Sequence, residues 1–353
     1  MIREDEDVLL RQTVVVAEAS EADRADWQRY VFAHPKATFF HRFEWRELLA
    51  EQWKHRPHFL IARRGADVVG VLPLALVRSR LFGTSLVSLP FCVYGGPIID
   101  DPEVLAALDA RALELAQAAG VGHLEYRSLE RLHPQWASTD LYVTFRKPVS
   151  ADEETNMKAI PRKQRAMVRK GISNGLVASI EDASSFFPVY SDNVHRHGTP
   201  GMPRSWFNAL ERAFGDECDT LVVRDAGGRV QSAVMSFYFR GEALPYYAGD
   251  FESARDLAAN DFKYWQLMCH AVRRGCRVFD YGRSKVGTGP FAFKKNWGFE
   301  ATPLPYEYRL VAAGDVPQNN PTNPKYRLMI ETWRRLPRPI VEWLGPKVVR
   351  GLG

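Results

Sequence analysis

The sequence predicts a duplicated α/β protein with a helical tail. Three observations carry this prediction: a hairpin–helix–strand pattern occurs twice, each helix stops at a glycine, and each following strand carries an acid and then a tyrosine. The acid–tyrosine pairs are Glu125-Tyr126 and Asp280-Tyr281. Because the order of elements and these markers repeat together, we favour duplication over chance similarity of two α/β stretches.

The first copy begins with two apolar runs, 59–63 and 68–77, joined by a glycine-bearing turn typical of a hairpin. A helix is predicted to follow Asp101, which suits an N-cap, with Pro102 at its first position and Gly120 as its stop. The apolar residues of this helix are expected on one face: Leu105, Leu108, Ala112, Leu115 and Ala119.

The second copy repeats this order. The runs 220–224 and 230–239 flank another glycine-bearing turn, and Gly275 stops the next helix. One row of that helix is Leu257, Asp261, Tyr264, Met268 and Val272. Asp261 is irregular in this row, so it faces either a cleft or the edge of the buried face. We predict domains at 1–150 and 151–314, and a tail at 315–353.

Composition limits the class of protein. With 353 residues and 46% hydrophobic content, the chain can form two cores. No apolar run approaches the length of a bilayer span, and the N-terminus is too acidic for a signal peptide. The four cysteines lack metal-site spacing, so we expect neither disulfides nor a metal. A cytoplasmic location is predicted.

A basic helix is predicted at 158–171, at the junction of the two copies, bracketed by Pro161 and Gly171. One side carries Ile160, Gln164, Val168 and Ile172, and the cations lie mostly on the other: Arg162, Lys163, Arg165, Arg169 and Lys170. Its cations are either a solvated face or the lining of a cleft between the copies. A phosphate-rich ligand, RNA or acidic lipid would each suit the second interpretation.

The segment 277–300 is the most informative part of the chain. After Asp280 comes a loop in which Gly282, Gly287 and Gly289 alternate with Arg283, Ser284 and Lys285. Phe293 and Trp297 then share a helix face at i,i+4 spacing. Glycines let backbone N–H groups converge and cations neutralise an anion, so the loop is predicted to bind phosphate.

Two other segments have competing interpretations. His195 and His197 are weak metal candidates; the turn at 197–201 instead suggests that His197 and Thr199 help to place an acceptor. In the tail, a proline-broken linker at 317–324 precedes helices in which apolar anchors alternate with arginines. We favour packing of these helices on the domain over docking to an anionic membrane surface.

Several segments together resemble the FemAB/FemX family of tandem GNAT-like N-acyltransferases. They are H-R-F-E-W at 41–45, V-Y-G-G-P at 93–97, I-P-R-K-Q-R-A-M-V-R-K-G at 160–171, H-G-T-P at 197–200, and D-Y-G-R-S-K-V-G-T-G-P-F-A-F-K-K-N-W-G-F at 280–299. The chain looks most similar to the FemAB-type proteins associated with exosortase/PEP-CTERM exopolysaccharide systems. The resemblance spans about residues 40–310, and the last segment is its most specific part.

The resemblance implies a fold and an activity. Fem enzymes pass an amino acid from aminoacyl-tRNA to an amine on a cell-wall precursor, and the lysine of their F-K-x-x-[FW]-G run is implicated in stabilising charge. That lysine is Lys294 here, preceded by Phe293. The implied partners are therefore tRNA and a polysaccharide or cell-wall precursor. Peripheral contact of the tail with the inner membrane stays the alternative to its packing on the domain.

Acyl transfer to an amine requires an anchored donor, a stabilised oxyanion and a neutral nucleophile. We assign Lys294 to the oxyanion or donor ester, and Arg283 and Lys285 to phosphate. Asp280 is the candidate base, although an acid at a strand end is as often a structural acceptor. Tyr281 is either an acid or a packing residue.

The alternative interpretations differ mainly in the donor of the transferred group. The Q/R-x-x-G-x-G/A run of acetyl-CoA-using relatives does not occur before the central helix of either copy, which disfavours acyl-CoA. No tightly bound cofactor is expected. Two rivals remain: a CoA-dependent N-acyltransferase acting on an amino sugar, and a non-catalytic module that binds nucleotide sugar or RNA.

Overall fold

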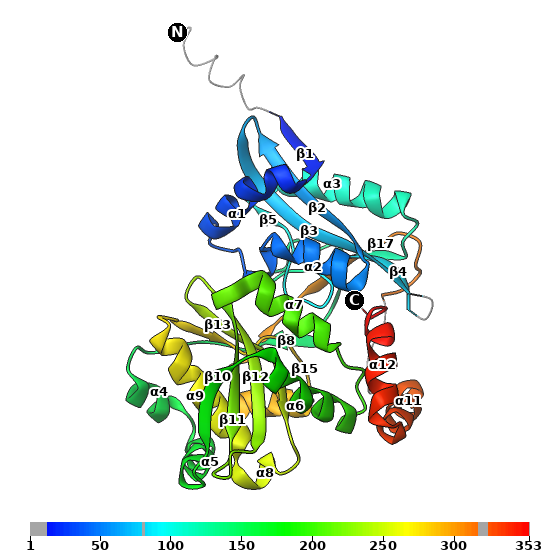
Figure 1. Ribbon diagram of the computed structural model, residues 1–353. Coiled ribbons are helices and arrows are strands. Elements are labelled where there is room, and N and C mark those ends of the chain that lie inside the picture. The colour runs from blue at the N-terminus through cyan, green and yellow to red at the C-terminus, as the bar shows by residue number, and fades with distance from the viewer. Residues whose placement is uncertain (1–12, 80–81, 317–323, 353) are drawn as a thin grey trace, which may run out of the picture. The chain divides into compact units, whose positions relative to one another are not determined.

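The protein folds as two compact units. A computed structural model describes residues 13–79, 82–316 and 324–352, and Figure 1 shows the elements. Within these, unit 1 comprises 13–138 with 306–316, and unit 2 comprises 139–305 with 324–352. The acidic N-terminal segment and most of the predicted linker at 317–324 lie outside the described residues.

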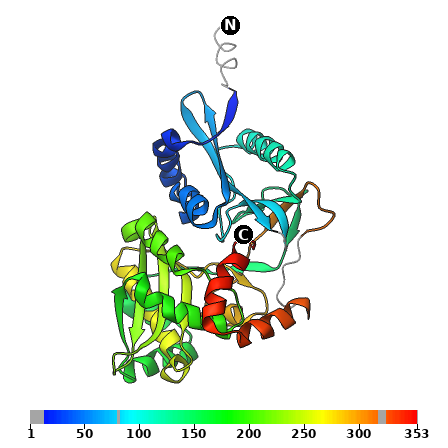
Figure 2. The same cartoon turned by 45° about the vertical axis from the view of Figure 1, so that its right-hand side comes forward.

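Unit 1 is a mixed sheet with helices on both faces. Its elements are β1 (Val14–Glu18), α1 (Arg24–Ala33), α2 (Glu44–Trp53), β2 (Arg56–Arg64), β3 (Asp67–Ser79), β4 (Gly83–Ser88), β5 (Ile98–Ile99), α3 (Pro102–Ala118), β6 (His123–Arg127), β7 (Ala137–Thr139) and β17 (Tyr306–Leu310). The strand order is β1-β2-β3-β4-β6-β17-β7, with β5 paired to β3. Helices α1 and α2 cover one face and α3 the other (Figure 2).

The start of α3 follows the predicted chemistry. The carboxylate of Asp101 accepts hydrogen bonds from the backbone N–H groups of Glu103 and Val104, at 2.9 and 3.1 Å. This N-cap satisfies donors that the first helical turn leaves unpaired. The buried row differs slightly from the prediction, since it consists of Val104, Leu108, Ala112 and Ala116. After the helix, Gly120 adopts a φ of 62°, which confirms the glycine stop.

Unit 2 contains the remaining elements. They are β8 (Tyr142–Thr144), β9 (Arg146–Pro148), α4 (Glu153–Ala159), α5 (Arg162–Ser173), β10 (Val177–Glu181), α6 (Ala183–Arg196), α7 (Arg204–Phe214), β11 (Cys218–Arg224), β12 (Val230–Phe239), β13 (Glu242–Asp250), α8 (Ala254–Leu257), α9 (Ala259–Arg273), β14 (Val278–Asp280), β15 (Ser284–Lys285), α10 (Gly289–Asn296), β16 (Thr302–Pro303), α11 (Pro324–Arg335) and α12 (Arg338–Val349). The main sheet has the order β10-β11-β12-β13-β14-β9, and a small sheet has the order β15-β8-β16.

The two main sheets share one topology. In each, four antiparallel strands are followed by a helix and a parallel strand: β4 pairs parallel with β6, and β13 with β14. A sixth, antiparallel strand then closes each set, β17 beside β6 and β9 beside β14. This equivalence confirms the predicted duplication.

The boundaries of the units differ from those predicted at 150 and 314. Strand β9 precedes the second copy in sequence yet pairs in its sheet, whereas β17 follows the second copy and pairs in the first. The two units therefore exchange their last strands. Residues 139–150 consequently belong to unit 2, and 306–314 belong to unit 1.

Helices from different parts of the chain cover the two faces of the unit 2 sheet. On β12, Phe237 contacts Phe214 of α7, with ring centroids 5.9 Å apart. The next residue, Tyr238, points to the other face and contacts His270 of α9 at 6.0 Å. This alternation follows from the two-residue period of a strand. The core on the α9 side also includes Phe279, Tyr281 and Trp297.

The predicted basic helix is two helices rather than one. The chain breaks at Ile160-Pro161, because the residue before a proline disfavours the helical region. Helix α5 then continues through Gly171, where an added Cβ would lie 2.7 Å from the Cβ of Phe262 in α9. Glycine is thus required by the close approach of two helices. Ile172, predicted on the buried side, is 49% exposed.

The tail forms α11 and α12, and both contact α6. Helix α12 buries Val341, Gly345 and Val349 on its inner side. At Gly345, an added Cβ would lie 3.1 Å from backbone atoms of Gly201. The favoured packing interpretation therefore describes this inner side. Of the helices in the described ranges, none combines the length and apolar character that a bilayer span requires.

Candidate active-site loop in unit 2

Strand β14 ends where the chain enters the predicted glycine-rich loop. Gly282 and Gly287 have φ values of 62° and 78°, in the region where glycine is favoured. Between them, Ser284 and Lys285 form β15, which pairs with Val143 and Tyr142 of β8. The loop is therefore partly a strand, and its two left-handed glycines lie on either side of the cationic residues.

Lys294 of α10 points back into this loop. Its Nζ donates hydrogen bonds to the backbone carbonyl oxygens of Tyr281, Gly282 and Arg283, at 2.7, 3.1 and 3.1 Å. An ammonium group has three N–H donors, so these three carbonyls satisfy it completely. The side chain is 9% exposed. Lys294 thus binds the backbone carbonyls of the first three residues after β14.

Lys294 is expected to change its protonation state near pH 7. Burial lowers the pKa of its amine to about 7, although the nearby Asp280 carboxylate opposes this shift and the Arg283 guanidinium adds to it. In the neutral form, the amine has two N–H donors and a lone pair. One of the three carbonyls then loses its partner, so protonation of Lys294 is coupled to the backbone of the loop.

Asp280 is fully buried and already has partners. Its carboxylate accepts a hydrogen bond from the backbone N–H of Gly282 at 2.7 Å and lies 3.3 Å from Nε of Arg146. These contacts are those of a structural acceptor that fixes the start of the loop. They do not place Asp280 where a substrate amine could reach it.

Tyr281 lies in the hydrophobic core. Its ring packs edge-on against Phe279, Tyr264 and Phe299, at centroid distances of 5.0, 5.0 and 4.6 Å. Burial raises the pKa of its phenol well above the usual value. The packing role, one of the two that we predicted, therefore describes the position of this side chain better than the acid role.

The predicted phosphate ligands gather around one ring. The guanidinium of Arg283 lies 4.5 Å from the ring centroid of Tyr142, and Nζ of Lys285 lies 5.7 Å from it. Burial, with a contribution from the Arg283 charge, lowers the pKa of Lys285 to about 8. Between them, the hydroxyl of Ser284 is buried and makes no hydrogen bond within the described part of the chain.

Helix α10 begins at Gly289 and carries Phe293. An added Cβ at Gly289 would meet no atom within 4 Å, so this helix start is open rather than enclosed. The rings of Phe293 and Trp297 lie 5.9 Å apart, as their i,i+4 spacing predicts. Phe293 is half-buried against the core, where it supports the orientation of α10.

The cations of α5 form an outward face in the same unit. Arg162, Lys163, Arg169 and Lys170 are exposed, and the ion pairs found among the described residues include none of them. Arg165 is half-buried and donates a long hydrogen bond, 3.4 Å, to the carbonyl oxygen of Lys158. An added Cβ at Gly298, just after α10, would lie 3.2 Å from Pro161, just before α5. The face therefore begins beside the end of α10.

The turn at His197 and Thr199 belongs to a different region of unit 2. His197 is the C-cap of α6, and its backbone carbonyl accepts a hydrogen bond from Arg334 of α11 at 3.4 Å. An added Cβ at Gly198 would lie 2.6 Å from Ile330. The described contacts link this turn to the tail and not to the loop after β14.

Sequence reasoning missed a buried charge cluster near the start of α9. Lys263 is fully buried, and its Nζ donates to Asp250 at the end of β13, at 2.8 Å. Asp261 accepts a hydrogen bond from the indole N–H of Trp297 at 2.9 Å, and burial raises the pKa of its carboxyl. The irregular position of Asp261 in its helix row was the signal.

The unit 1 motifs form a buried structural cluster. Nε2 of His41 lies 2.8 Å from the carbonyl oxygen of Gly96, which joins the 41–45 and 93–97 segments. Arg127 donates to the Glu125 carboxylate at 2.7 Å and to the carbonyl oxygens of Leu89 and Cys92, both at 2.9 Å. All of these side chains are buried. The position that corresponds to the loop of unit 2 is therefore filled by protein groups.

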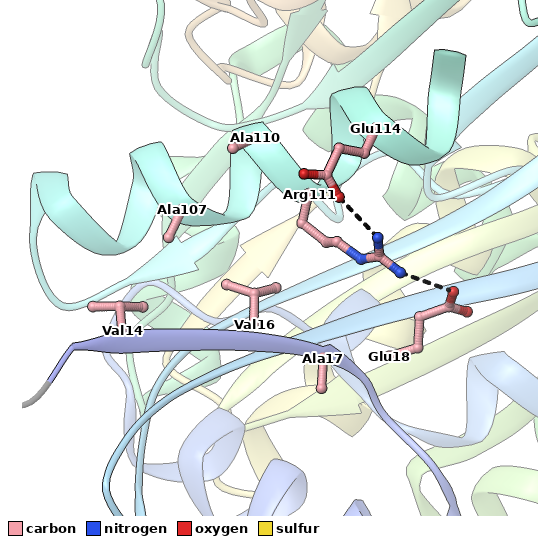
Figure 3. Close-up of a pocket in the computed structure, with 8 residues that line it drawn as sticks. All are labelled: Val14, Val16, Ala17, Glu18, Ala107, Ala110, Arg111 and Glu114. Carbon is pink, nitrogen blue, oxygen red and sulfur yellow. Dashed lines mark hydrogen bonds and ion pairs between the residues drawn. The ribbon is translucent and has the colours of Figure 1, made fainter. Parts of the chain in front are cut away.

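A separate hollow lies elsewhere in unit 1. It has a volume of about 560 Å³ and lies between β1 and α3, where Arg111 contacts both Glu18 and Glu114 (Figure 3). None of the predicted site residues lines it. Over the described residues, no group of three or more His, Cys, Asp or Glu side chains could hold a metal ion.

Comparison with known proteins assigns the fold. Residues 156–295, all in unit 2, match the family model described as an acetyltransferase (GNAT) domain. The crystal structure of FemX is similar over 90% of this chain and 100% of its own, with a TM-score of 0.67 and 14% identity. A tandem GNAT protein from the clavulanic acid biosynthesis pathway is similar over 86% and 99%, with a TM-score of 0.54 and 13% identity.

A third similar structure is the C-terminal domain of a protein assigned as a lysylphosphatidylglycerol synthetase from Agrobacterium fabrum. It covers 82% of this chain and 93% of its own, with a TM-score of 0.56 and 13% identity. A comparison with curated protein sequences finds no match. The duplicated topology and these similar structures assign a tandem GNAT-like fold to the protein, and residues 156–295 of unit 2 match an acetyltransferase (GNAT) domain.

Proposed function

We propose that unit 2 transfers an aminoacyl or acyl group to an amine, with the loop after β14 as the reacting centre. The observation that carries this proposal is Lys294, a buried lysine bound to the loop whose pKa is about 7. A group whose pKa lies near the working pH can both accept and return a proton. Amide formation from an ester or thioester requires both steps.

The proposed reaction balances around one proton. The acceptor amine attacks the carbonyl carbon of the donor and forms the C–N bond, and neutral Lys294 accepts the proton that the nitrogen loses. The tetrahedral intermediate then expels the oxygen or sulfur of the donor, which takes the proton from Lys294. Lys294 returns to its neutral form with the amide product released.

This role revises the one expected from sequence. As an ammonium, Lys294 would have to exchange one of its three carbonyl partners before it could bind an oxyanion. As a neutral amine it donates to two of these carbonyls, and its lone pair takes the third position, so either role requires Lys294 to release one carbonyl. The pKa of about 7, rather than the contact geometry, favours proton transfer over direct stabilisation of the oxyanion by Lys294.

For the donor we propose aminoacyl-tRNA. The unpaired cations of α5, together with Arg283 and Lys285 at the loop, would bind successive phosphates of an RNA strand. The Q/R-x-x-G-x-G/A run with which acetyl-CoA-using relatives bind pyrophosphate does not precede α9 in the sequence. The resemblance of the 160–171 and 280–299 segments to the FemAB/FemX family suggests an acceptor amine on a cell-wall or exopolysaccharide precursor.

An acyl-CoA donor is the second candidate. The match of residues 156–295 to an acetyltransferase domain favours it, because GNAT domains use acyl-CoA as a donor rather than as a tightly bound cofactor. The acceptor in this case would be an amino sugar.

The two donors are separable in one experiment. The purified protein is incubated with bulk aminoacyl-tRNA or with acetyl-CoA, each radiolabelled in the transferred group. Amino sugars and a nucleotide-linked peptide precursor of the cell wall serve as acceptors. We expect label to leave the tRNA and enter an acceptor. Consumption of acetyl-CoA alone would support the second candidate, and RNA binding without consumption of either donor would indicate a non-catalytic module.

A further inference from the structure

Helix α12 has two opposite faces, and packing explains only one of them. The inner face buries Val341, Gly345 and Val349. Trp343, two residues before Gly345 and so about 200° away around the helix, is 64% exposed, and Ile340 is 44% exposed. An indole so exposed gains no stability from the core, so the outer face calls for a different explanation.

The outer face combines apolar and cationic side chains in one row. Ile340, Trp343, Lys347 and Arg350 follow one another at spacings of three and four residues, which places them on the same side of the helix. Nζ of Lys347 lies 3.2 Å from the ring centroid of Trp343. Beyond the helix, Leu352 is also exposed. We define these five residues as the α12 outer face.

The α12 outer face is held rigidly on unit 2. Glu342 accepts a hydrogen bond from the hydroxyl of Ser191 in α6 at 2.6 Å, and Arg338 lies 3.8 Å from Asp192. Figures 1 and 2 show α11 and α12 beside α6. The orientation of Trp343 is therefore set by packing of the opposite side of its helix.

Positive charges outnumber negative charges around this face. From residue 329 to 352, the cations are Arg334, Arg335, Arg338, Lys347 and Arg350, and the acids are Glu331 and Glu342. Both Arg338 and Ser191 contact Glu342, so the negative charge of this carboxylate is partly compensated. A partner of complementary chemistry must therefore offer negative charge beside an apolar layer.

We propose that the α12 outer face binds an anionic membrane surface. Tryptophan places its apolar ring at the boundary of headgroups and acyl chains, with its N–H near water. Ile340 and Leu352 would enter the same layer, while Lys347 and Arg350 would lie at the level of phosphate headgroups. RNA would use the cations but would leave Ile340 and Leu352 without apolar contacts. This inference does not depend on the proposed acyl transfer.

Vesicle sedimentation of the full chain tests the proposal. We expect binding to vesicles of phosphatidylglycerol mixed with phosphatidylcholine, and little binding to phosphatidylcholine alone. Trp343→Ala should reduce the partition coefficient about tenfold, because one large apolar side chain is lost. Lys347→Ala should reduce it about fivefold, as one cation near a charged surface does.

Two matched controls isolate the face. Phe32 in unit 1 is also an exposed ring beneath a cation, with Arg42 at 5.2 Å, so Phe32→Ala removes a comparable group elsewhere. Arg212→Ala removes an exposed cation of α7. Both variants should bind vesicles like the wild type. Circular dichroism and thermal melting should show all four variants folded.

A second readout locates Trp343 directly. Lipids brominated along the acyl chain should quench wild-type fluorescence more than that of Trp343→Phe, which keeps an apolar ring but removes this indole. The proposal is overturned if the wild type ignores phosphatidylglycerol, if Trp343→Ala and Phe32→Ala act alike, or if brominated lipids quench both proteins equally. Self-association that Trp343→Ala abolishes would instead make the face an interface between two copies.

Discussion

The two units of this protein share a topology but differ at one strand junction. In unit 1, β4 and β6 pair at four positions, from Ser85 to Ser88. In unit 2, β13 and β14 pair only at Glu242 and Ala243, although β13 continues to Asp250. The comparison indicates that the two copies differ in how far their central parallel strands pair.

The cations beside these junctions differ in the same way. Arg127 of unit 1 forms a buried ion pair with Glu125 and joins two loop carbonyls. Lys294 of unit 2 binds three carbonyls without an acid in hydrogen-bond contact among the described groups, and its pKa is about 7. A paired guanidinium stays charged, whereas a buried amine can change its charge. We therefore infer that unit 1 is a scaffold and unit 2 the reacting unit.

Replacement of Lys294 should have the largest effect on activity. Lys294→Met removes the proton acceptor, so the single-turnover transfer rate should fall by about 10²–10⁴-fold. The neighbouring Lys295 is exposed, with its Nζ 5.6 Å from the ring centroid of Phe291, and Lys295→Met should transfer at nearly the wild-type rate. Equal rates for both variants would remove the functional distinction between the units.

Replacement of Arg127 should affect stability rather than chemistry. Arg127→Met leaves the buried Glu125 carboxylate without its partner, so the free energy of unfolding should fall by about 3–5 kcal/mol. Urea denaturation measures this change. Glu125→Gln added to Arg127→Met should restore part of the loss. If the folded variant lost transfer activity as severely as Lys294→Met, unit 1 would be more than a scaffold.

The exchanged strand gives unit 1 a dependence on pH. Glu307 of β17 lies 3.5 Å from Nδ1 of His133, whose Nε2 lies 2.8 Å from Asp109. Burial opposes the charge, yet these two acids raise the pKa of His133 to about 9. Because the folded state binds the proton more tightly than the unfolded state, protonation of His133 stabilises the fold. This stabilisation is complete below about pH 6.5, the pKa of a histidine in the unfolded chain.

As pH rises from about 6.5 to 9, this contribution of about 3 kcal/mol should be lost. His133→Gln should be less stable at pH 6, and its stability should vary less over this interval. Urea midpoints at several pH values provide the measurement. A wild-type midpoint that increases steadily from pH 6.5 to 9 would contradict the predicted sign.

The smallest effects are expected on the α5 face. Arg162→Ala or Arg169→Ala should each weaken RNA binding severalfold and reduce the slope of log affinity against log salt by roughly 0.7–0.9 per lost phosphate contact. Arg212 of α7 is exposed and serves as a control. If Arg212→Ala weakened binding as much as Arg169→Ala, the α5 face would have no special role.

Local chemistry explains which parts of the fold the sequence could predict. The N-cap at Asp101 and the stops at Gly120 and Gly275 depend on neighbouring residues, so they could be derived. The exchange of β9 and β17 could not, because these short strands acquire their partners from tertiary contacts. The duplicated order suggested two consecutive domains, and the chain instead returns to unit 1.

The site shows the same limit. The loop and Lys294 were identifiable from glycines, cations and the family resemblance, but the directions of side chains were not. Tyr281 faces the core and Asp280 is held by Gly282 and Arg146. The packing of His197 and Gly198 against α11 also depends on a tail that lies far away in sequence.

The pH dependence of single-turnover transfer, measured at saturating donor in the wild type and in Arg283→Met, tests the central claim most directly. The rate should rise through pH 7 and then level, because Lys294 must be neutral to accept the proton. The Arg283 charge lowers the pKa of Lys294, so Arg283→Met should move this ionisation to higher pH, while ionisation of the acceptor amine stays in place. A rate that falls through pH 7, or an ionisation unmoved by Arg283→Met, would contradict proton transfer by Lys294.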